Sequence, residues 1–185
     1  MSELNSLFVK VKIKKNNLDD FFKSKPNEPK IDTNWTEWWN SREMSGKSEL
    51  SQDQMHCYEQ PNNQSIVESW VNDKRSGGFS EYDQENEIWN FGIVFFGNNY
   101  FEIIPGLVFI KSITDYIEDD VDNFAIVFDF FWNGDEVSTY TDFKDNKGYF
   151  KPEVQIKSDI NSEHIKYSET YLAKKTQEFS KAYED

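Results

Sequence analysis

The sequence predicts an α+β fold, with an antiparallel sheet of about five or six strands, helices packed on one face and a C-terminal helix. Three observations lead to this class. Residues 7–14 alternate with the two-residue period of a strand, residues 124–143 resemble two strands around an Asn-Gly turn, and residues 162–185 carry apolar side chains at helical spacing. We therefore expect a sheet with helices rather than an all-α or all-β protein.

Length and composition favour one domain with an appendage. The chain has 185 residues and a net charge of −14, but its 16 Phe, 9 Tyr and 6 Trp argue against disorder, because each aromatic buries a large apolar area. The character of the sequence changes at Pro152. We predict a single α+β domain at 1–151 and a helical extension at 152–185, docked on the domain.

The N-terminal half predicts one strand and three helices. In residues 7–14 the lysines share one face, which suits an edge strand facing solvent. Short helices are expected after Asn17 and after 32–34, the second burying a cluster of three tryptophans. Residues 40–63 are polar and predict a loop. A third helix is expected from Ser65, whose capping box ends at Glu68.

The second half predicts mainly hairpins. Residues 88–96 should form a strand, 100–104 a returning strand and 107–110 an extended segment, followed by a short helix from 112. The strands 124–132 and 135–143 should then meet around Asn133-Gly134, a pair that suits a type I′ turn. That turn would place Phe130 opposite Val137.

No motif in the sequence predicts catalysis or a cofactor. Gly46-Lys47-Ser48 lacks the glycine and the preceding strand of a phosphate-binding loop. Cys57 is the single cysteine, and a pairing with His164 stays open. The acids of 115–122 do not have calcium-loop spacing, and two histidines with one cysteine make a transition-metal site unfavourable. Carboxylate pairs such as Asp129 with Glu102 are not distinguished among 34 acids.

The same features predict a cytoplasmic location. One cysteine excludes an intramolecular disulfide, the first residues lack the pattern of a signal peptide, and no apolar run approaches the length of a membrane span. The acidity disfavours nucleic acid and anionic membranes as direct partners, because phosphate binding needs clustered Lys and Arg. The oligomeric state is left open.

The most informative segment is the acidic block 81–142. It carries 14 Asp and Glu, 15 aromatics and one basic residue, Lys111. Acidic surfaces accelerate association with basic partners, and aromatic side chains anchor interfaces. We therefore predict a non-enzymatic acidic binding protein, a bacterial immunity protein or antitoxin that neutralises a basic toxin such as a nuclease. The alternatives are a small enzyme using carboxylates in a cleft of the sheet and a scaffold that self-associates through its C-terminal helix.

The predicted partner-binding residues are the exposed acids of this block and the aromatic nearest to them. They fall into three groups along the chain. The full set is Glu81, Asp83, Glu85, Glu87, Asp115, Glu118, Asp119, Asp120, Asp122, Trp132, Asp135 and Glu136.

Overall fold

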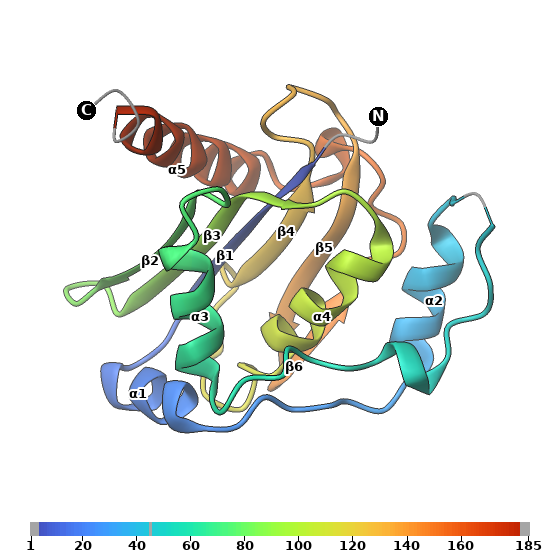
Figure 1. Ribbon diagram of the computed structural model, residues 1–185, viewed down its shortest axis with the longest axis horizontal. Helices are drawn as coiled ribbons and strands as arrows, with labels where there is room; N and C mark the ends of the chain where they lie inside the picture. The colour runs from blue at the N-terminus through green and yellow to red at the C-terminus, as the bar shows by residue number, and fades with distance from the viewer. Residues whose placement is uncertain (1–3, 45, 182–185) are drawn as a thin grey trace.

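The computed structural model describes residues 4–44 and 46–181 and confirms the α+β class. In these residues one antiparallel sheet has the order β2-β3-β1-β4-β5-β6 (Figure 1). The strands are β1 (Asn5–Lys12), β2 (Gly78–Asp83), β3 (Ile88–Gly97), β4 (Phe124–Phe128), β5 (Val137–Lys144) and β6 (Lys147–Phe150). The helices are α1 (Lys15–Lys23), α2 (Thr33–Ser41), α3 (Asn63–Asn72), α4 (Tyr100–Lys111) and α5 (Ser162–Lys181).

Helices cover both faces of the sheet. The larger core cluster joins one face to α1, α2, α3 and α4, and the smaller cluster joins the other face to α5 (Figure 1). Alternation along β1 feeds both clusters, because Val9 faces the first cluster and Phe8 the second. Phe8 lies 5.5 Å from the ring of Tyr171 in α5.

The edge position expected for the first strand is wrong. β1 is paired on both sides, with β3 and with β4, and the edges of the sheet are β2 and β6. The face of β1 that carries the lysines is covered by α5, and Phe8 on that face is buried. Lys10 extends along the same face and places its Nζ 4.6 Å from the centroid of the Tyr167 ring. Long lysine stems reach solvent past a docked helix.

The three N-terminal helices form as the apolar spacing predicts, but α1 begins at Lys15, before the expected cap Asn17. α2 begins after Asp32, whose side chain accepts a hydrogen bond from the Trp35 amide. α3 is capped by Asn62, so the capping box expected at Ser65 is wrong. All three tryptophans of α2 are at most 1% exposed. Between α2 and α3, the described residues 42–44 and 46–62 are irregular apart from one 3₁₀ turn, Gln52–Gln54.

The strands expected at 100–104 and 107–110 are wrong, because both segments belong to α4. Its β-branched and aromatic residues resemble strand composition. They occupy a helix that is apolar nearly all round, and such a helix carries no amphipathic period to reveal it. Asn99 caps its N-terminus by accepting from the Glu102 amide. Pro105 lies inside the helix, and the short helix expected from 112 is a series of turns.

The hairpin of β4 and β5 exists, but its turn and register differ from the prediction. Ile126 lies opposite Tyr140, and residues 129–136 form a wide loop closed by a bond from the Asp129 amide to the Glu136 carbonyl. The two-residue turn with positive φ at both centres is Asp145-Asn146, at 51° and 55°, between β5 and β6. β2 and β6 were not predicted, because both are short and polar edge strands.

α5 packs on the sheet through the smaller core cluster, which joins the fully buried Leu172 to residues of the strands β1 to β5. At the edge of the sheet, Glu81 of β2 accepts hydrogen bonds from Tyr171 and Lys175 of this helix. Among the described residues, the helices are too short or too polar to cross a bilayer.

Candidate functional site

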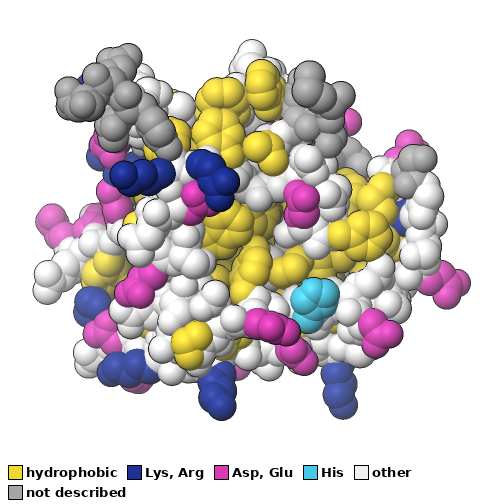
Figure 2. All heavy atoms as spheres, in the orientation of Figure 1, with side chains coloured by type: hydrophobic (Ala, Val, Ile, Leu, Met, Phe, Trp, Pro, Cys, Tyr) yellow, Lys and Arg dark blue, Asp and Glu magenta, His cyan; other side chains and the backbone are white. Residues whose placement is uncertain are grey.

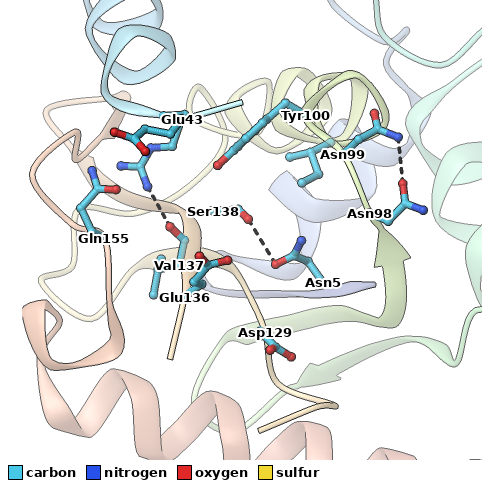
Figure 3. A pocket seen from close by; sticks show the side chains of 12 residues that line it. Asn5, Glu43, Asn98, Asn99, Tyr100, Asp129, Glu136, Val137, Ser138 and Gln155 are labelled. Carbon is cyan, nitrogen blue, oxygen red and sulfur yellow. Dashed lines mark hydrogen bonds between the residues drawn. The ribbon is translucent and has the colours of Figure 1, made fainter. Parts of the chain in front are cut away.

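The candidate site is a cleft of about 460 Å³ at the end of the sheet where β1 begins and β4 ends. Figure 3 shows side chains from five parts of the chain converging on it. They come from β1, the segment after α2, the start of α4, the β4–β5 loop with the start of β5, and the segment near 155. The residues whose chemistry matters are Asn5, Arg42, Glu43, Asn98, Asn99, Tyr100, Asp129, Glu136, Ser138 and Gln155.

Arg42 holds the wall of the cleft together. Its guanidinium donates to the carbonyl oxygens of Val137, Pro152 and Val154 at 2.8, 3.0 and 2.7 Å, and the residue is 2% exposed. Because all these acceptors are backbone oxygens, Arg42 has no carboxylate partner among the described residues. It fixes the position of the β5 start, and its buried charge is engaged by the fold.

The cleft presents mainly acidic and amide groups to solvent. Three carboxylates, Glu43, Asp129 and Glu136, line it against the single guanidinium. Glu43 and Glu136 are exposed, and Glu136 lies centrally in Figure 3. The floor is held by a bond from Ser138 Oγ to Asn5 Oδ1 at 3.1 Å. Such a lining binds a cation or a hydrogen-bond donor rather than an anion.

Two exposed aromatic side chains lie on the β4–β5 loop, which supplies two of the three cleft carboxylates, Asp129 and Glu136. Phe131 is 40% exposed and Trp132 is 54% exposed, and their ring centroids are 5.2 Å apart. Phe131 also packs against Phe95 of β3 at 4.7 Å. In Figure 2, hydrophobic side chains gather at the top of the view, where Figure 1 places the β4–β5 loop. The loop therefore joins an acidic cleft to an aromatic surface.

The structure does not bring the three predicted acidic groups together. Glu136 lines the cleft, and Asp135 and Trp132 lie on the same β4–β5 loop. The β2–β3 turn, with Asp83, Glu85 and Glu87, lies at the opposite end of the sheet, as does the segment before β4. That segment carries Glu118, Asp119, Asp120 and Asp122, and the exposed Asp115 lies in the turns after α4. The acidic block is thus divided between two ends of one sheet.

Several of these acids already have partners within the chain. Glu118 pairs with Lys14 at 3.1 Å and Asp120 with Lys12 at 3.5 Å. Asp122 lies 3.3 Å from His164 Nε2, and Glu81 is bound by α5. Asp83 accepts hydrogen bonds from its own turn, and these hold its pKa below the usual value. These paired acids contribute to the fold, and less of their charge is therefore available to a partner.

The nucleophile and phosphate-loop patterns have structural explanations. Cys57 lies against α4, on the opposite face of the sheet from His164 in α5, and burial raises its thiol pKa to about 11. A buried thiol of this kind is a poor nucleophile. Lys47 donates to the Trp39 carbonyl at 3.0 Å and also to the Arg42 carbonyl, so it caps the end of α2.

The carboxylates of Glu102 and Asp129 each accept a hydrogen bond from a different segment of the backbone. Glu102 accepts from the Asn98 amide at 3.0 Å, within the α4 cap. Asp129 accepts from the Trp132 amide at 3.2 Å and shapes the loop. In the part of the chain that the structure describes, no three His, Cys, Asp or Glu side chains are grouped to hold a metal.

Sequence reasoning missed Arg42, Asn5 and Gln155 as cleft residues. Isolated polar residues in loops carry no periodic signal, and only the tertiary fold brings them to one place.

Comparison of the chain with family models, curated proteins and solved structures finds no match.

Proposed function

We propose that the chain is a non-enzymatic binding protein of the immunity or antitoxin class, which neutralises a basic toxin in the cytoplasm. The observation that supports this most is the β4–β5 loop. It carries the exposed Phe131 and Trp132 between Asp129 and Glu136, two of the carboxylates that line the cleft. Tight protein interfaces combine buried aromatic anchors with complementary charge, and both occur here within eight residues, 129–136.

The chemistry of the cleft limits the partner. Three carboxylates face one buried guanidinium, so a Lys or Arg side chain of a partner would gain hydrogen bonds and Coulomb energy there. Toxins that hold nucleic acid, such as nucleases, display such side chains around their phosphate sites. A segment carrying them would place basic groups in the cleft and an apolar contact on Trp132.

The first experiment is capture of partners from the native cell at low and at high salt. We expect a basic protein to be retained at low salt and released as screening increases. Its toxic or nuclease activity should be inhibited by this chain at equimolar ratio. Failure to retain any basic protein at low salt, or retention without inhibition, would contradict the proposal.

The second experiment places the interface. With the captured partner, Trp132→Ala should weaken binding by roughly 10- to 30-fold, the loss typical of an interface anchor. Glu136→Lys should slow association by introducing a like charge. Glu85→Lys is the matched control, because it changes the charge equally at the opposite end of the sheet. Equal effects of Glu136→Lys and Glu85→Lys would remove the cleft from the interface.

A further inference from the structure

A second cavity, on the side of the molecule where α2 begins, has the opposite electrostatic character. Its volume is about 240 Å³, and it lies between the start of α2, the end of α4 and β6. Three lysines line it, Lys30, Lys111 and Lys147, together with one carboxylate, Asp32. In a chain with net charge −14 this is a local excess of positive charge.

Lys111, the one basic residue of the acidic block, forms the inner wall. Its Nζ lies 4.0 Å from the centroid of the Phe150 ring and 5.0 Å from that of Trp35. It donates to Asn34 Oδ1 at 3.2 Å. A lysine ammonium carries three donors, and no other hydrogen bond or ion pair of this group occurs among the described residues. Burial lowers its pKa to about 8.

Asp32 is the one carboxylate that lines the cavity; its charge partly offsets the effect of burial on Lys111, but the two groups form no ion pair among the described residues. The Asp32 carboxylate accepts from the Trp35 amide as the cap of α2. Lys30 and Lys147 are exposed at the cavity, and neither forms an ion pair within the described residues. A partly buried charge without a direct ion-pair partner is unfavourable, and an arriving anion reduces that cost.

We propose that this cavity binds a small oxyanion, a carboxylate or phosphate group of a small molecule. Lys111 is the inner ligand, and Lys30 and Lys147 lie beside it at the surface. Tyr149, 38% exposed and also lining the cavity, offers a hydroxyl and an aromatic face for the remainder of the molecule. The cavity volume of about 240 Å³ is several times the roughly 30 Å³ that one water molecule occupies in the liquid, so a phosphate or a short carboxylate fits inside it. This site is separate from the acidic cleft and does not depend on the proposed function.

The test follows the titration of lysine side chains by NMR, in protein labelled with ¹³C at the lysine ε-carbon. Lys111 is assigned by the signal that disappears in Lys111→Gln. Inorganic phosphate and acetate are added as separate series, with sodium chloride at matched ionic strength as the reference. We expect either oxyanion to raise the Lys111 titration midpoint at least half a pH unit above the chloride reference, in a saturable manner.

Two variants on the same hairpin distinguish a site from general screening. Lys147→Gln should weaken the oxyanion effect on Lys111 at least fivefold. Lys144→Gln, an exposed lysine on the other side of the Asp145-Asn146 turn, should leave it unchanged. The proposal is overturned if Lys111 titrates alike in phosphate, acetate and chloride, or if Lys147→Gln and Lys144→Gln have equal effects. If Lys111→Gln does not fold, the assignment is made instead through Asn34→Ala, which changes the environment of the same amine.

Discussion

Arg42 joins two distant parts of the chain through one side chain. Its guanidinium donates to the Val137 carbonyl at the start of β5 and to the carbonyls of Pro152 and Val154, all more than ninety residues away in sequence. Buried carbonyls without a donor cost about 1–3 kcal/mol each, and neighbouring losses do not add fully. The cleft wall therefore depends on this arginine.

We expect Arg42→Met to reduce the free energy of unfolding by about 3–5 kcal/mol, the usual cost of removing one partner of a buried charged network. Urea denaturation followed by circular dichroism measures it. Arg75→Met is the control, because the Arg75 side chain is 90% exposed and should change stability by about 0.5 kcal/mol or less. Comparable losses in the two variants would show that the carbonyl network contributes little.

Lys111 should make stability depend on pH. Its folded pKa of about 8 lies below the ordinary value of 10.5, so the unfolded chain binds this proton more tightly. The cost is complete below about pH 8 and is relieved as the pH rises toward 10.5. At about 1.4 kcal/mol for each pKa unit, the full effect is about 3 kcal/mol.

Lys111→Met removes that titration. We expect the variant to be at least as stable as the natural chain at about pH 7, because Asn34 Oδ1 still accepts from the Phe150 amide. Its advantage should decrease by up to about 3 kcal/mol as the pH approaches 10.5. Urea denaturation of both proteins, with Lys144→Met as an exposed control, gives the difference. A pH-independent difference would contradict the assignment.

At the scale of elements, α4 and α5 show two ways in which a helix is stabilised. α4 is surrounded by apolar residues and needs no amphipathic pattern, because the sheet, α2 and the segment before α3 cover it. α5 covers the other face of the sheet through a narrow stripe, with Leu172 at its centre. Its polar edge is fastened by Lys175 to Glu81.

We expect Leu172→Ala to lower the free energy of unfolding by about 2–5 kcal/mol, the usual range for a fully buried leucine. Lys174→Ala, at a side chain that is 63% exposed, should have little effect. Sedimentation of the same samples tests whether α5 assembles chains instead. If Leu172→Ala changed the mass in solution but not the stability, the helix would serve a partner chain rather than its own sheet.

At the scale of the whole molecule, the acidic charge lies at both ends of one sheet. The end near the β2–β3 turn is partly neutralised by Lys12 and Lys14, and the hydrogen bond to Glu118 raises the pKa of Lys14. Among the described residues that line the cleft at the other end, Arg42 is the one basic residue, and it is buried. A protein partner that is attracted by negative charge thus meets two different acidic surfaces.

This division predicts different outcomes for two variants of equal net charge. Glu118→Lys places a like charge beside Lys14 and should lower the melting temperature. Asp119→Lys, at an exposed acid with no ion pair among the described residues, should leave it nearly unchanged. Thermal denaturation at low salt compares them, and equal melting temperatures would show that the pair with Lys14 is not stabilising. Asp119→Lys is consequently the clean probe of this end in binding assays.

Local patterns in the sequence were sufficient for the fold class, for β1, and for the helices α1, α2, α3 and α5. Each has an apolar spacing that repeats within a few residues. The same local rules failed for α4, whose uniform apolarity carries no period. They also failed for the β4–β5 turn, where Asp129 and the bond from the Val137 amide to the Gln155 carbonyl stabilise a wide loop.

The sequence by itself determined that this is an acidic, aromatic-rich α+β protein whose charge lies mostly in 81–142. Only the tertiary structure decided where that charge lies, which acids are already paired, and that Arg42 and Lys111 each line a cavity. The physical reason is that charge and composition are sums along the chain. A cleft depends on which distant segments meet, and that follows from strand order and packing.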